Sequence, residues 1–103
     1  MNTPHTSSVL LTPELIARFA EVGGQPSENP LVICKFIDPS GLATFYATEF
    51  HVGWNLFYGY THLLDGEWGC FSLDKLSKAI NRSGLSIERD VYFRECRFSE
   101  LKL

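Results

Sequence analysis

The sequence lacks a long apolar run, and it lacks a basic segment followed by an apolar one at its start. Its longest apolar stretch covers residues 31–37 and contains Lys35, whereas a membrane-spanning helix needs roughly 20 apolar residues. The first five residues, MNTPH, do not have the pattern of a secretory signal. We therefore expect a cytoplasmic protein with no membrane-embedded part.

Paired cysteines are also absent. The three cysteines, Cys34, Cys70 and Cys96, stand far apart, and none belongs to a C-x-x-C pair. Disulfide frameworks and structural zinc sites depend on evenly paired or closely spaced cysteines. The sequence thus predicts reduced thiols packed within the protein, with no metal and no cofactor.

Basic side chains are missing from the middle of the chain. Between Lys35 and Lys75 there are 39 consecutive residues without Lys or Arg. Up to Asp74 the chain holds two basic side chains against eight acidic ones, and from Lys75 on it holds seven against four. Because phosphates are bound mainly by Lys and Arg, any nucleic-acid contact is expected to come from the last third.

The remaining composition is that of one small folded domain. The chain has 103 residues, of which 45% are hydrophobic and 14% aromatic. This length accommodates a single core, and large aromatic rings fill a small core efficiently. We expect a flexible tail over residues 1–10 and a single α+β domain over residues 11–103.

Capping residues and hydrophobic patterns predict the elements of this domain. Residues 12–14 (TPE) begin a helix that residues 23–24 (GG) end, and Ser72 begins a second helix that Gly84 ends. Apolar and alternating segments predict five strands, over residues 31–38, 42–50, 55–63, 67–71 and 90–96.

Short connections join the predicted strands into a β-meander. Residues 38–41 (DPSG) and Asp65-Gly66 are turn signals, and Gly59 inside a strand indicates a bulge or the close approach of another group. The order predicts an α+β fold with an antiparallel sheet of about five strands and two helices packed on one face. The other face is expected to stay open.

Large amphipathic side chains are expected on that open face. Tyr58 and Tyr60 lie on one side of their strand because side chains alternate, and Tyr46 lies on the same side of the preceding strand. Trp68 belongs to the next strand, and Trp54 to a connection. Such residues are typical of interface hot spots, so these five are the candidate protein-binding residues.

Charged residues support an alternative function in nucleic-acid binding or cleavage. A metal-dependent nuclease would use carboxylates to hold its cation, and the candidates are Glu49, Glu67, Glu88 and Asp90. Binding of single-stranded nucleic acid would combine the aromatic meander with three basic residues near the end of the chain, Arg89, Arg94 and Arg97. For residues 88–90 the simpler interpretation is a solvated turn with an internal ion pair.

Two weaker groupings have simpler structural interpretations. Glu49, His51 and His62 contain metal-ligating side chains, but exposed histidines in a loop and at a strand end are the better interpretation. Cys70 precedes the second helix, and a helix start can lower the pKa of a thiol. Packing within its strand is the simpler interpretation.

Five blocks of sequence resemble one known family. They are LVICKF at 31–36, YATEF at 46–50, FYGY at 57–60, GEWGCFSL at 66–73 and IERDVYF at 87–93. In this order they resemble DUF2958, a family of uncharacterised small prokaryotic proteins, over roughly residues 12–95. The segment HVGWN at 51–55 departs from the more acidic connection that the resemblance leads us to expect.

The resemblance implies a bacterial, plasmid or phage origin and supplies no catalytic residues. We therefore expect a non-enzymatic, protein-binding accessory module of a mobile genetic element, such as an inhibitor of host defence that occupies the surface of a protein partner. Nucleic-acid binding or cleavage is the alternative. The sequence leaves open whether the chain forms a homodimer.

Overall fold

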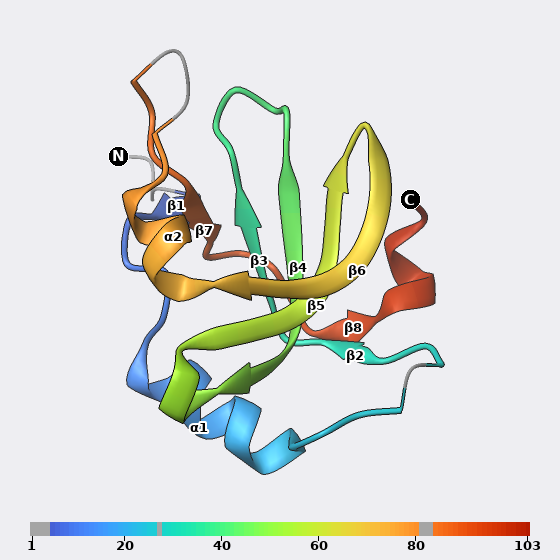
Figure 1. Cartoon of the computed structure of the whole chain (residues 1–103). Coiled ribbons are helices and arrows are strands. Elements are labelled where there is room, and N and C mark those ends of the chain that lie inside the picture. Colours follow the sequence, from blue (N-terminus) through green and yellow to red (C-terminus); the bar gives the residue numbers. More distant parts are fainter. Residues whose placement is uncertain (1–4, 27, 81–83) are drawn as a thin grey trace.

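A six-stranded antiparallel sheet with the order β1-β7-β3-β4-β5-β6 forms the centre of the protein. The computed structural model describes residues 5–26, 28–80 and 84–103 (Figure 1). In order of chain, the strands of this sheet are β1 (Thr6–Ser7), β3 (Cys34–Ile37), β4 (Thr44–His51), β5 (Leu56–Leu63), β6 (Asp65–Ser72) and β7 (Glu88–Asp90). The predicted α+β class and antiparallel sheet are confirmed.

Four helical segments and a second, two-stranded sheet complete the described part of the chain. The small sheet pairs β2 (Leu31–Val32) with β8 (Cys96–Arg97). The helical segments are α1 (Pro13–Val22), α2 (Leu73–Lys78) and the short 3₁₀ helices η1 (Val52–Trp54) and η2 (Phe98–Leu101). Among the described residues, no helix has the length and apolar character needed to cross a membrane.

Side-chain caps begin both α-helices at the predicted residues. The hydroxyl of Thr12 accepts a hydrogen bond from the N–H of Leu15, and that of Ser72 accepts one from the N–H of Lys75. The predicted end of α2 at Gly84 was wrong, because the helix ends at Lys78. Ile80 instead forms a β-bridge with Ser86, so the chain after α2 is already extended.

The first and last predicted strands are each divided in the structure. Where one strand was predicted over residues 31–38, the structure has β2 and β3, which are separated by Ile33. The N–H of Ile33 donates to the carbonyl oxygen of Ala47 at 2.9 Å. The predicted strand over residues 90–96 was wrong. Asp90 ends β7 with a turn, in which its carboxylate accepts from the N–H of Tyr92 at 3.0 Å. The chain then leaves the main sheet and pairs with β2.

The hairpin between β5 and β6 turns at Leu64, and the predicted turn at Asp65-Gly66 was wrong. Gly66 pairs with His62 inside the ladder, and Leu64 has a φ of 61° and is 92% exposed. The ring of Tyr60 lies over Gly66, where an added Cβ would be 1.6 Å from the tyrosine oxygen. The lack of a side chain at Gly66 therefore makes room for the ring of Tyr60, and the left-handed conformation of the turn is adopted by Leu64.

One face of the sheet carries the core, and both α-helices pack on it. Phe19 of α1 and Leu76 of α2 belong to the same buried cluster as Phe36 and Phe57. Phe57 has no exposed surface, and its ring centroid lies 4.7–5.9 Å from those of four others, Phe19, Phe36, Phe50 and Phe71. Leu10 also lies in this cluster.

The segment predicted as a flexible tail takes part in the sheet. Thr6 and Ser7 form β1 and pair with Asp90 and Arg89 of β7. Together with buried Leu10, they attach this segment to the domain. Residues 1–4 lie outside the described residues.

The opposite face of the sheet is partly covered by residues 93–101, which we call the C-terminal segment. The Nε–H of Arg18 on α1 is shared between the two carboxylate oxygens of Glu95, at 2.9 and 3.1 Å, and Nη2 donates to Oε1 at 2.9 Å. Phe98 packs against Tyr60 and Trp68, with ring centroids 4.8 and 4.7 Å apart. The sequence had led us to expect an open face, but the C-terminal segment covers part of it.

Candidate functional site

A β-bulge in β4 shapes the part of the second face that stays open. Thr48 is the extra residue between the pairs Ala47–Gly59 and Glu49–Tyr58. Its hydroxyl donates to the carbonyl oxygen of Tyr58 at 3.1 Å. Because a bulge increases the local twist of a strand, the end of β4 bends, and Glu49 projects from the same face as Tyr58.

The loop between α1 and β2 is fastened to this bulge by Gln25. Its side-chain amide nitrogen donates to the carbonyl oxygens of Leu31 and Thr48, both at 2.8 Å, and its side-chain oxygen accepts from the N–H of Leu31 at 2.7 Å. Its backbone N–H donates to Glu49 Oε2 at 3.2 Å. Sequence reasoning missed Gln25, since no local pattern marks such a long-range contact.

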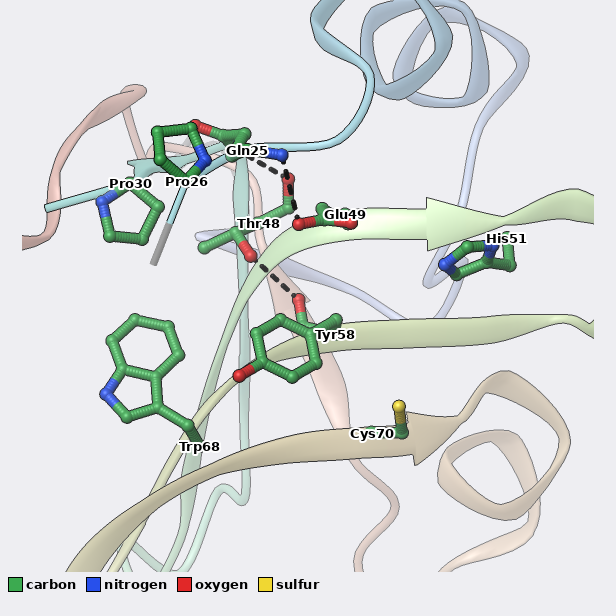
Figure 2. A pocket seen from close by; sticks show the side chains of 9 residues that line it. All are labelled: Gln25, Pro26, Pro30, Thr48, Glu49, His51, Tyr58, Trp68 and Cys70. Carbon is green, nitrogen blue, oxygen red and sulfur yellow. Dashed lines mark hydrogen bonds between the residues drawn. The ribbon is translucent and has the colours of Figure 1, made fainter. Parts of the chain in front are cut away.

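A pocket of about 420 Å³ lies between this loop and the sheet. Figure 2 shows its lining side chains: Gln25, Pro26, Pro30, Thr48, Glu49, His51, Tyr58, Trp68 and Cys70. The two prolines face the rings of Tyr58 and Trp68 across it (Figure 2). These two rings stack with centroids 6.2 Å apart and an interplanar angle of 19°.

The five candidate binding residues have different environments. Tyr46, Tyr60 and Trp68 stand opposite one another on neighbouring strands, which confirms that they share a face. However, Tyr46 is only 6% exposed and lies under Phe93 of the C-terminal segment. Burial raises the pKa of the Tyr46 hydroxyl. Tyr46 is thus removed from the accessible surface.

Of the remaining four, two line the pocket. These are Tyr58 and Trp68, and Trp68 is 38% exposed. Tyr60 is half-buried beneath Phe98. Trp54 is 80% exposed on η1 and does not line the pocket.

The four carboxylates of the nuclease alternative are not brought together. Glu67 projects from the face opposite to Trp68, because side chains alternate along β6. Glu88 accepts a hydrogen bond from the Thr6 hydroxyl, and Asp90 lies 3.9 Å from the amine of Lys35. Both belong to β7, which β3 separates from Glu49 on β4. Within residues 5–26, 28–80 and 84–103, no group of three or more His, Cys, Asp or Glu residues is arranged to hold a metal.

The histidine and arginine candidates are also dispersed. Glu49 and His51 both line the pocket, whereas His62 pairs with Thr44 at the far end of β5. Arg89 donates from Nε to the carbonyl oxygen of Val9 at 2.9 Å. Arg94 and Arg97 are exposed on the C-terminal segment, and nucleic-acid binding by these three residues stays a prediction.

The three thiols lie in three different environments. Cys34 is 3% exposed, as expected of a packed thiol, and burial raises its pKa to about 12. Cys96 is half-buried, and burial also raises the pKa of its thiol. Cys70 was predicted to pack within its strand, but it is exposed and lines the pocket. The prediction was wrong because Cys70 lies on the pocket face of the edge strand β6.

Timed labelling with iodoacetamide near pH 8 should modify Cys70 first, Cys96 more slowly and Cys34 last. The thiolate is the reactive form, and the raised pKa of Cys34 leaves far less thiolate at this pH than an ordinary thiol has. Peptide mass spectrometry of the native protein measures the three rates. In urea all three rates should converge. Equal rates for Cys34 and Cys70 in the native protein would contradict the structure.

Comparison with known proteins assigns the chain to a family. No curated protein and no solved structure matched it. A family model described as "Protein of unknown function (DUF2958)" matches residues 10–100, a range that includes all five sequence blocks and every residue of the pocket. The chain therefore belongs to the DUF2958 family of proteins of unknown function.

Proposed function

We propose that the protein is a non-enzymatic binding module that holds a protein partner at the pocket beside Tyr58 and Trp68. The observation that carries this proposal is an accessible aromatic pair at the mouth of a pocket whose opposite wall is already fastened by Gln25. Tyr and Trp are enriched among the residues that contribute most to protein–protein affinity.

Rigidity of the pocket supports this proposal. Trp68 packs between Tyr58 and Phe98, with centroid distances of 6.2 and 4.7 Å. The bulge residue Thr48 is bonded to both Gln25 and Tyr58. Since the loss of side-chain and loop freedom opposes binding, groups that are fixed beforehand favour a tighter complex.

The proposal extends to the cellular role. We place the protein in the cytoplasm of a bacterial cell, as an accessory protein of a plasmid or phage that inhibits a host defence component. This part depends on the resemblance of the sequence to its family.

Photo-crosslinking can test the binding proposal. Benzoylphenylalanine in place of His51, an exposed residue of the pocket lining, should capture one protein in host cells. The same label in place of Tyr92, which is 51% exposed outside the pocket lining, is the control. Binding of the captured protein, once purified, should then be measured by titration calorimetry.

A second substitution links the captured protein to the pocket. Trp68→Ala should weaken the measured affinity at least tenfold, because a hot-spot residue contributes about 2 kcal/mol or more. Trp54→Ala is the matched control, since it removes an exposed tryptophan that does not line the pocket. Equal capture by the two labels, or an unchanged affinity of Trp68→Ala, would refute the proposed function.

A further inference from the structure

We infer that the pocket receives a cationic side chain of the partner, and that an arginine guanidinium fits it best. This inference rests on the proposed function and specifies the chemistry of the bound group. It depends on three features of the pocket: the charges of its lining, the hydrogen bonding of Glu49, and the aromatic pair.

Among the residues that the structure describes, the lining of the pocket contains one carboxylate, Glu49, one histidine, His51, and no Lys or Arg. The strands β4, β5 and β6 all fall within residues 36–74, the part of the chain that lacks Lys and Arg. An anionic group would meet Glu49 without a compensating cation and would be repelled. An aliphatic group would exclude water from Glu49 and offer it no hydrogen bond, which is unfavourable for a charged group.

One oxygen of the Glu49 carboxylate accepts a hydrogen bond that holds the group in place, and the other oxygen can accept one from a ligand. Oε2 accepts the backbone N–H of Gln25 at 3.2 Å, which holds the carboxylate at the pocket (Figure 2). Oε1 accepts no hydrogen bond from any residue that the structure describes. A guanidinium has five N–H donors and can pair with a carboxylate, so it supplies the missing donor.

The aromatic pair offers the second interaction that a cation requires. A cation within about 6 Å of a ring centroid is attracted to the face of a tryptophan or tyrosine. The protein already uses this geometry on the same face, where the amine of Lys35 lies 5.8 Å from the ring centroid of Tyr46. In the pocket, Tyr58 and Trp68 present their rings opposite Pro26 and Pro30 (Figure 2).

Arginine fits this combination better than lysine. Its guanidinium is planar, stacks on aromatic rings and is more weakly hydrated than an ammonium group. It therefore loses less on entering a pocket whose walls include two large aromatic rings and two prolines.

Peptide binding followed by tryptophan fluorescence can test the inference. In a Trp54→Phe background, Trp68 is the only tryptophan in the chain, so its emission reports on the pocket. The probes are N-acetylated, C-amidated Gly-Arg-Gly and the same peptide with citrulline, which keeps the size and planarity of arginine without its charge. The arginine peptide should bind at least tenfold more tightly, which corresponds to about 1.4 kcal/mol.

Two variants that each remove one negative charge identify the residue that binds the cation. Glu49→Gln should reduce the preference for arginine over citrulline to less than about twofold, because the ion pair is lost while the Gln25 N–H keeps an acceptor. Glu67→Gln removes the same charge from the opposite sheet face and should leave the preference unchanged. Circular dichroism of both variants checks that they remain folded.

The outcomes separate this inference from the proposed function. Equal binding of the two peptides, no saturation with the arginine peptide at tens of millimolar, or an equal effect of the two glutamine variants would each overturn the inference. In that case the proposed function still stands if the label at His51 captures a protein and Trp68→Ala weakens its binding. The bound group of that protein is then not a cation.

Discussion

Phe57→Ala is expected to destabilise the protein by about 3–5 kcal/mol, the range measured when a buried phenylalanine is truncated to alanine. Phe57 has no exposed surface and contacts four other phenylalanine rings. It lies on β5 between β4 and β6, so the resulting cavity would open beneath both helices. A domain of this size has a total stability of about 5–15 kcal/mol, and the loss is a large part of it.

Urea unfolding followed by far-ultraviolet circular dichroism measures this effect. Trp54→Ala is the control, because it removes a comparable ring that is 80% exposed on η1, and it should change the stability by less than about 0.5 kcal/mol. A cost for Phe57→Ala as small as that of the control would show that the packing around β5 is not as described.

Features determined by neighbouring residues were predictable from the sequence. Thr12 and Ser72 begin the two helices, as their capping side chains indicated. The alternation along β5 correctly placed Tyr58 and Tyr60 on the same face. Each of these features depends on hydrogen bonds or periodicity within a few residues, which a single sequence contains.

Features determined by distant residues were not predictable. The Asp65-Gly66 pair has the composition of a hairpin turn, but the packing of Tyr60 over Gly66 places it in the strand. Tyr46 alternates correctly with its neighbours, yet Phe93 covers it from a segment almost fifty residues away. A local pattern shows which face a side chain occupies, but it does not show what covers that face.

The candidate site illustrates both cases. Tyr58 and Trp68 were among the predicted binding residues, and both line the pocket. Its opposite wall was missed, because Gln25 becomes structural only through contacts with Leu31 and with the bulge at Thr48. Gly59 had indicated a bulge or a close approach at this point, although the extra residue of the bulge lies in the neighbouring strand.

Gly59→Ala is expected to destabilise the protein by about 3 kcal/mol or more, at the upper end of the range for overpacked positions. A Cβ at residue 59 would lie 1.9 Å from the carbonyl oxygen of Tyr46 and 3.0 Å from the Cα of Ala47. Both are backbone atoms in β4, which is bonded on its other side to β3. β4 cannot move away from residue 59 without breaking its hydrogen bonds to β3 or to β5.

The same substitution should also damage the pocket. Gly59 pairs with Ala47 directly before the bulge, so a displaced β4 would move Thr48 away from the side chain of Gln25. The loop that carries Pro26 would then lose part of its attachment. We expect the Trp68 fluorescence of the Trp54→Phe background to shift towards that of a solvent-exposed indole, in addition to a lower urea midpoint.

Gly69→Ala is a closely matched control, because Gly69 is the cross-strand partner of Gly59 and a Cβ there would meet no atom within 4 Å. Its stability should be unchanged or raised by up to about 1 kcal/mol, since alanine has less freedom than glycine in the unfolded chain. If the two variants unfold at the same urea concentration, the close approach of β4 to Gly59 is refuted. If only Gly59→Ala is destabilised and its Trp68 emission shifts, the bulge is what holds both the sheet and the pocket wall in place.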